Sequence, residues 1–152
     1  MADDDPTRRV PKDSAEAVKW YRKAAEQGSA AGQYGLGLMC SNGDGMPKDS
    51  AEAVKWFRKA AEQGFAAAQY NLGVMYYTGD GVPEDEIEAL AWYKIAAASG
   101  SDIAVRDRDA LEQHLGREMT LVAQQRSREI LKEIEAAKTC SAGPTAVDAA
   151  PP

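Results

Sequence analysis

The sequence is poor in the residues that build metal sites and disulfide frameworks. Its 152 residues include two cysteines, Cys40 and Cys140, and one histidine, His114. Two distant cysteines without a repeating pair do not indicate a disulfide framework. A lone histidine with no cysteine nearby cannot begin an ordinary zinc site, and the D-x-D-x-D-G calcium spacing is missing. No nucleophile, base and orienting group come together either, so we expect no metal, no cofactor and no catalytic residue.

The sequence also lacks a surplus of positive charge and a long apolar run. It has 18 Lys and Arg against 24 Asp and Glu, a formal charge of −6, whereas nucleic-acid binding needs a basic face. No apolar run approaches the roughly 18–20 residues of a membrane span. The first residues, MADDDPTRRV, do not resemble a secretory signal. We therefore expect neither a nucleic-acid partner nor a membrane span and, by default, the cytoplasm; a periplasmic or secreted protein whose signal had been removed would look the same.

What the sequence does contain is an internal repeat. The repeated segments are PKDSAEAVKW at 11–20 and 47–56, RKAAEQG at 22–28 and 58–64, and NGDG at 42–45 with TGDG at 78–81. The offset is 36 residues (Pro47 against Pro11), and a looser third copy starts at Val82. A period of about 20 to 50 residues is typical of stacked repeats, so this pattern predicts a solenoid.

Each copy carries the start and stop signals of helices. Asp13, Asp49 and Asp85 are expected N-caps, each with a glutamate three residues further on, as in a capping box. A glycine follows each helix as its stop, at 28, 64 and 100. Helices of a second type are expected at about 30–41 and 66–77, each ending in a glycine-rich turn. Each full copy therefore predicts a pair of helices.

The segments outside the copies are of two kinds. Residues 101–116 and about 120–138 each combine an apolar side with a charged side, which suits the polar-faced terminal helices that a repeat array needs. We expect two capping helices over 101–138 and a solenoid over 11–138. Residues 1–10 and 139–152 show no periodicity and contain proline, so we expect them to be a disordered lead-in and a disordered tail.

The region 66–100 carries the residue pattern of a known family, A-Q-Y-x-L-G-x-x-Y, then G-x-G-V-x-x-D, then A-x-x-W-Y-x-x-A-A-x-x-G. The matching residues are Ala68, Gln69, Tyr70, Leu72, Gly73, Tyr76, Gly79, Gly81, Val82, Asp85, Ala89, Trp92, Tyr93, Ala96, Ala97 and Gly100. The chain thus resembles the Sel-one-like repeat family, the α/α relatives of the tetratricopeptide repeat. The resemblance implies an all-α fold, a right-handed superhelix of antiparallel helix pairs with C-terminal capping helices. In the register of the family the chain has a half repeat at 14–28 and full repeats at 29–64 and 65–100.

The resemblance also implies a function in protein–protein interaction, without catalysis. Family members resemble adaptors in bacterial signalling, envelope regulation and host contact, and in eukaryotic protein quality control. Cysteine-rich relatives have been linked to β-lactam hydrolysis or penicillin binding, but they carry a cysteine pair in every repeat. This chain lacks that pair, and Cys40 replaces the tyrosine found at Tyr76. Self-association into a homo-oligomer, through an end or a groove of the solenoid, stays open as an alternative.

The differences between the two close copies suggest where a partner would bind. Residues 11–45 and 47–81 differ at the pairs 21/57, 29/65, 32/68, 35/71, 38/74, 40/76, 41/77 and 42/78. All but the first fall in or beside the second helix type, and at 100° per residue positions 35, 38 and 42 share one face. Two interpretations stay open. Either this is simply an exposed face that tolerates change, or it is the concave lining of the solenoid, where a peptide would bind.

On the second interpretation, nine residues form the binding surface. They are Tyr34, Gly35, Leu38, Asn42, Tyr70, Asn71, Val74, Tyr77 and Thr78. The Asn71 amide could hold a peptide backbone through its donor and its acceptor, and the tyrosines would add apolar area with a polar tip.

Three further features have simpler interpretations. The evenly spaced Trp20, Trp56 and Trp92 are expected to pack between repeats rather than to stack on a ligand. His114 is expected to pack on a helix surface, and Cys40 to be a small core residue that replaces tyrosine.

Overall fold

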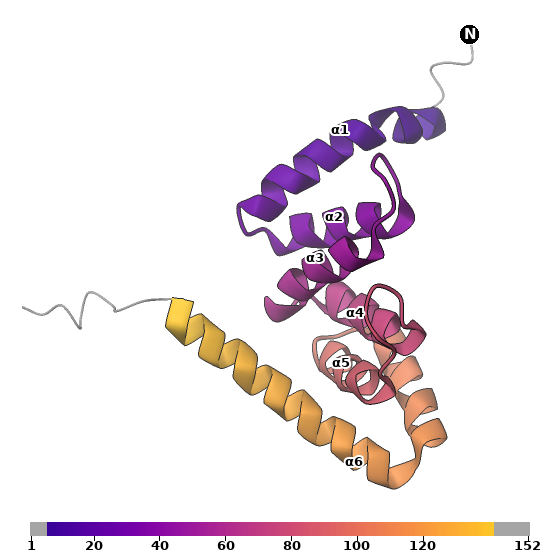
Figure 1. The fold of residues 1–152 in the computed structure, drawn as a ribbon, viewed down its shortest axis with the longest axis vertical. Helices are drawn as coiled ribbons and strands as arrows, with labels where there is room; N and C mark the ends of the chain where they lie inside the picture. Colours follow the sequence, from indigo (N-terminus) through magenta and orange to yellow (C-terminus); the bar gives the residue numbers. More distant parts are fainter. Residues whose placement is uncertain (1–5, 142–152) are drawn as a thin grey trace, which may run out of the picture.

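Six helices make up the described part of the chain, and the first five follow one another in a stack (Figure 1). The computed structural model describes residues 6–141. Its helices are α1 (Pro6–Glu26), α2 (Ala30–Asn42), α3 (Ser50–Glu62), α4 (Ala66–Thr78), α5 (Glu86–Ala98) and α6 (Asp102–Ser141). Residues 6–141 contain no strand, and each helix packs on the next one along the chain. The predicted all-α solenoid is therefore confirmed.

The capping signals place the starts of α3 and α5 correctly. A carboxylate oxygen of Asp49 accepts a hydrogen bond from the Glu52 N–H at 3.1 Å, and Asp85 accepts one from the Glu88 N–H at 3.0 Å. The prediction for the first helix is wrong, because α1 already begins at Pro6 and includes Asp13. Proline suits a first helical position, where its missing N–H has no partner to lose.

The flanking segments also differ from the expectation. Residues 6–10 of the expected disordered lead-in belong to α1, and residues 139–141 of the expected tail belong to α6. Residues 1–5 and 142–152 lie outside the described part of the chain. The two expected capping helices form one element that bends sharply at Gly116, whose φ of 83° and ψ of 175° are not helical.

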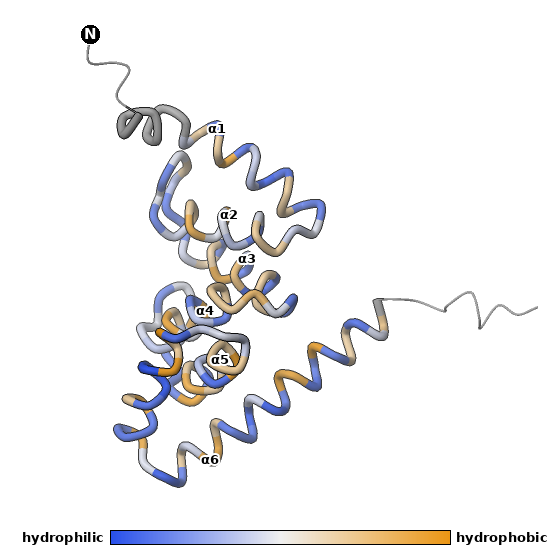
Figure 2. The backbone as a smooth tube through the Cα atoms, turned by 180° about the vertical axis from the view of Figure 1, so that it is seen from behind, coloured by the Kyte–Doolittle hydropathy of each residue, from blue (hydrophilic) through white to orange (hydrophobic). Residues whose placement is uncertain are grey.

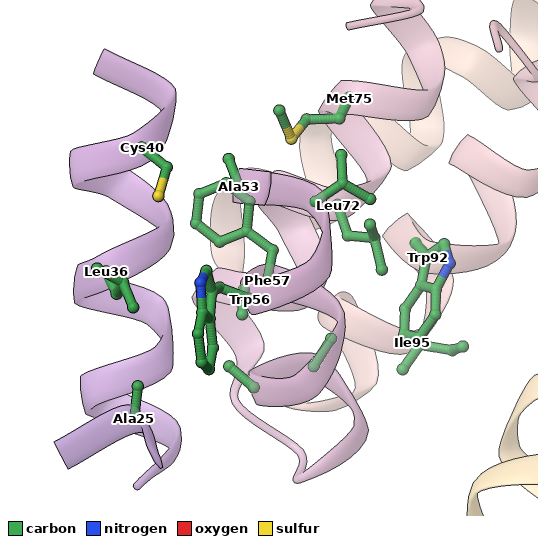
Figure 3. Packing of buried hydrophobic residues seen from close by; sticks show 14 of the residues in the cluster. Ala25, Leu36, Cys40, Ala53, Trp56, Phe57, Leu72, Met75, Trp92 and Ile95 are labelled. Atoms are coloured by element: carbon green, nitrogen blue, oxygen red, sulfur yellow. The ribbon is translucent and has the colours of Figure 1, made fainter. Parts of the chain in front are cut away.

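Mid-helix glycines allow close packing within each repeat. An added Cβ at Gly37 would lie 2.7 Å from the ring of Phe57, and one at Gly73 would lie 2.7 Å from the ring of Tyr93. The adjacent Leu36 and Leu72 are fully buried (Figure 3). The close approach explains why glycine is used inside these helices despite its cost of about 1 kcal/mol relative to alanine.

The three tryptophans do not share one environment. Trp92 is fully buried and Trp56 is 8% exposed, and both point into the packed interior (Figure 3). Trp20 is 66% exposed, so the prediction that it packs between repeats is wrong. The reason is its place in the stack: Trp20 lies on α1, and no described helix precedes α1 to cover the ring.

The second half of α6 turns back along the stack toward α3 (Figure 1). Its Ile130 is buried in the same cluster as Trp92, and along the tube its apolar residues alternate with polar ones (Figure 2). Arg126 donates two hydrogen bonds to the Glu88 carboxylate, at 2.8 and 3.2 Å. The hydrogen bonds to Glu88, together with the negative charges of Glu88 and Glu133, raise the pKa of Arg126 above its ordinary value. The half-helix is thus attached to α5 by apolar packing and by charge.

Candidate functional site

A hollow lies between α2 and α4 and contains five of the nine predicted binding residues. We call it the central hollow, of about 230 Å³. Its lining residues are Leu38, Ser41, Asn42, Phe57, Asn71, Val74, Met75, Thr78 and Asp80. Positions that differ between the two copies are thus brought side by side, because successive helices of the second type stack in the same orientation.

A second hollow lies between α4, α5 and the first half of α6. We call it the tyrosine hollow, of about 290 Å³, and its lining residues are Val74, Tyr77, Tyr93, Asp107, Ala110, Leu111 and His114. Val74 lines both hollows, so they are neighbours on one face, which we call the groove face. Within the described part of the chain, no lysine or arginine lines either hollow, whereas Asp80 and Asp107 do.

The repeat register explains why the groove face continues onto α6. Leu38, Val74 and Ala110 are spaced 36 residues apart, as are Asn42, Thr78 and His114. The sequence predicts only a capping helix over 101–116. It therefore does not predict that the groove face includes Asp107, Ala110, Leu111 and His114. The signal that could have found them is the 36-residue spacing, which persists after the recognisable motif has faded. His114 lines a hollow, whereas helix-surface packing was expected.

Asn71 has the chemistry of a backbone-binding residue. Its side chain is half-buried and lines the central hollow beside Phe57 and Val74. Among the described residues its amide has no hydrogen-bond partner, so both the donor and the acceptor are available. Thr78 differs, because its hydroxyl already donates to the Val74 carbonyl at 2.9 Å.

Tyr70 connects two helices at the edge of this face. Its hydroxyl donates a hydrogen bond of 2.6 Å to a carboxylate oxygen of Asp107 on α6, and its ring stacks on Tyr93 with centroids 5.6 Å apart. Burial, the hydrogen bond and the charge of Asp107 raise the pKa of Tyr70 to about 12. Burial is also the main reason why the pKa of Tyr93 is raised. Both phenols therefore stay neutral and protonated at physiological pH.

Tyr34 and Gly35 do not line either hollow, unlike the expectation. Tyr34 packs within its own repeat, with its ring 5.9 Å from that of Phe57 on α3 and 5.1 Å from that of Phe65. Gly35 is buried, and a Cβ there would lie 2.6 Å from the ring of Tyr21. A helical wheel places position 35 toward the groove face. In the structure α1 packs so closely on α2 that a side chain at position 35 would clash with the ring of Tyr21.

Cys40 has the properties of a core residue, as expected. It is fully buried, and its Sγ lies 3.6 Å from the Sδ of Met46. Burial raises the pKa of the Cys40 thiol, and Glu52 adds to the effect. Cys40 therefore stays a protonated thiol of low reactivity.

The described residues show neither a metal-binding cluster nor a membrane-spanning helix. Within 6–141, no three His, Cys, Asp or Glu side chains gather in a way that could hold a metal ion. No helix in this range is both long and apolar enough to cross a membrane.

Comparisons with solved structures agree with the fold. The protein c5321, a protective antigen present in uropathogenic Escherichia coli strains and displaying an SLR fold, is 34% identical with a TM-score of 0.77. The match covers 89% of this chain and 30% of that one. A Sel1 repeat protein from Oxalobacter formigenes is 46% identical with a TM-score of 0.60, over 62% of this chain and 39% of that one. This chain thus spans less than half the length of both proteins.

A more distant structure shares the fold alone. Cysteine-rich protein B (hcpB) from Helicobacter pylori is 23% identical with a TM-score of 0.56, over 65% of this chain and 89% of that one. No curated protein matches the chain.

The family comparison extends the repeats recognised in the sequence. The sequence model described as Sel1 repeat matches residues 7–29, 30–65 and 66–101. The two full repeats are thus shifted by one residue from the expected 29–64 and 65–100, and the first match begins before the expected half repeat at 14–28. This chain therefore belongs to the Sel1 repeat family, whose members are generally protein–protein interaction modules.

Proposed function

We propose that this chain is a non-catalytic adaptor that binds a peptide segment of another protein along the groove face. The observation that carries the proposal is the convergence of Leu38, Asn42, Asn71, Val74 and Thr78 on the central hollow. These positions vary between otherwise near-identical copies; a few core positions, such as Cys40 and Phe57, vary as well. Varied side chains that gather around one hollow offer a distinct surface to a partner, and this supports recognition.

The chemistry of the groove face favours an extended peptide. Leu38, Val74 and Ala110 give an apolar path along three stacked helices, which suits alternate side chains of a partner. The unpaired amide of Asn71 lies on this path and can bond to a peptide backbone through both of its groups. Apolar contacts would supply affinity, and the amide would set the register of the peptide.

The test begins with a peptide library selected against the purified protein, followed by affinity measurements. We expect Asn71→Ala to weaken the selected peptides about fivefold to tenfold, since one or two net hydrogen bonds are lost. Val74→Arg, which fills both hollows, should abolish binding. Lys55→Ala is the matched control, because Lys55 is exposed on α3 and lines neither hollow of the groove face. Equal affinity of all four proteins would refute the proposal.

Self-association is a second candidate function, and it rests on one observation. Trp20 is 66% exposed and the adjacent Tyr21 is 39% exposed, so α1 presents an aromatic edge that another copy could cover. Light scattering behind a sizing column at several concentrations tests this. A mass that rises with concentration for the wild type and not for Trp20→Ser would support self-association, whereas a constant monomer mass would refute it.

A further inference from the structure

The tyrosine hollow has the chemical character of a cation-binding pocket. Its walls include Tyr77 and Tyr93, and its polar groups include Asp107 and His114. Among the residues that the structure describes, no lysine or arginine lines the hollow. Aromatic faces and a carboxylate attract an ammonium or guanidinium group, and no positive charge of the hollow's own competes for it.

The carboxylate of Asp107 can accept a further hydrogen bond. One of its carboxylate oxygens accepts the Tyr70 hydroxyl at 2.6 Å, and the other accepts no hydrogen bond from the described residues. The side chain is half-buried, so its charge is less screened than on an open surface. Tyr70 thus holds the carboxylate in place while one oxygen remains available to a ligand.

Tyr93 adds a second polar group to the wall of the hollow. Its side chain is 3% exposed and lines the hollow, yet its hydroxyl has no hydrogen-bond partner among the described residues. Its hydroxyl oxygen is not among the fully buried atoms that lack a partner, so it is open to solvent and to a ligand. The charge of Asp107 contributes to the raised pKa of Tyr93, which shows that the two groups are close enough to interact. The phenol stays neutral, so its oxygen can accept a hydrogen bond from a cation.

We propose that the tyrosine hollow is a subsite for a basic side chain, lysine or arginine, of the bound peptide. Asp107 and the Tyr93 hydroxyl accept its N–H groups, and the ring of Tyr77, which is 45% exposed, covers its aliphatic stem. The neighbouring central hollow takes an adjacent residue of the same peptide, because Val74 forms the wall between the two. This subsite rests on the proposed peptide-binding function, but it can be tested without any selected peptide.

The probes are Nα-acetyl-lysinamide, Nα-acetyl-argininamide and the neutral isostere Nα-acetyl-norleucinamide, at equal ionic strength. His114 is the only histidine of the chain and lines the hollow, so its ring-proton NMR signals report occupancy directly. We expect saturable shifts with one or both cationic amides, at a Kd on the order of 1 mM for ligands of this size. Their relative affinities distinguish lysine from arginine. The neutral amide should cause no saturable shift.

Two variants and one control make the result specific. Asp107→Asn keeps an acceptor for Tyr70 and removes the charge, so it should weaken binding about tenfold. Tyr77→Ala, at an exposed position, should weaken it several-fold. Glu135→Gln removes an exposed carboxylate from the second half of α6, at a position that lines neither hollow, and should leave the affinity unchanged.

The subsite is overturned if the cationic amides cause no shift, if norleucinamide shifts His114 equally, or if Asp107→Asn binds as the wild type does. Selected peptides that depend on Asn71 but lack any basic residue would also overturn it, while leaving the proposed function intact. Amide binding at His114 without any Asn71-dependent peptide would support the subsite and count against the proposed function.

Discussion

The hydroxyl of Tyr70 on α4 donates a hydrogen bond of 2.6 Å to Asp107 on α6, so α4 and the capping helix are joined at the edge of the groove face. Tyr70 also stacks on Tyr93 of α5. One tyrosine therefore contacts two neighbouring helices, and it fixes the carboxylate that we assign to the cation subsite.

Removing this hydroxyl should lower stability modestly. We expect Tyr70→Phe to reduce the free energy of unfolding by about 1 kcal/mol, since the ring packing is kept and the half-buried carboxylate can be rehydrated. Urea denaturation followed by circular dichroism measures the change. The control is Tyr77→Phe, whose ring is 45% exposed and whose hydroxyl makes no hydrogen bond with the described residues; it should change stability by much less. Equal effects would argue against the Tyr70–Asp107 contact.

The same contact predicts an alkaline transition. The pKa of Tyr70 is raised from 10.0 to about 12 in the folded state, so folding favours its protonated form. This contribution to stability is complete below pH 10 and is lost as the pH rises from 10 to about 12. Denaturation midpoints measured over this range should fall for the wild type and fall less steeply for Tyr70→Phe. Parallel curves for the two proteins would contradict a raised pKa of Tyr70 in the folded state.

The tryptophans should differ in their contribution to stability. Trp56→Ala and Trp92→Ala should each cost about 3–5 kcal/mol, because a large buried ring is replaced by a cavity. Trp20→Ala should cost less than about 1 kcal/mol, since its ring is 66% exposed. Thermal and urea unfolding of the three variants tests this, and a loss at Trp20 as large as that at Trp56 would mean that another surface covers α1.

The ion pair between Arg126 and Glu88 should hold the second half of α6 on α5. We expect Arg126→Ala to cost about 2 kcal/mol, because it leaves the nearly buried Glu88 carboxylate without its partner. Arg128→Ala, at an exposed position of the same helix, should have little effect. Limited proteolysis should cut the Arg126→Ala protein within 117–141 sooner than the wild type; an unchanged cleavage rate would contradict this attachment.

The sequence predicts the repeat architecture well because its signals are local. Asp49 and Asp85 define helix starts through their own side-chain hydrogen bonds, and such signals need no knowledge of the neighbours. The sequence also predicts five of the residues that line the central hollow, because copies that stack in register bring equivalent positions together.

The failures all depend on neighbours that periodicity does not reveal. Position 35 falls on the groove side of the helical wheel, but the approach of α1 and its Tyr21 encloses Gly35. Trp20 matches Trp56 in sequence, but no described helix precedes α1 to cover it. His114 belongs to the groove face only through a repeat register that the capping residues no longer display.

The most direct test of the central claim is to map a selected peptide on the protein by backbone amide NMR. We expect the peptide to shift the backbone amide signals of Leu38, Asn71, Val74 and Asp107, while those of Lys55 and Lys59 on α3 do not change. Shifts concentrated on α3 or on the second half of α6, with the groove face unchanged, would contradict it.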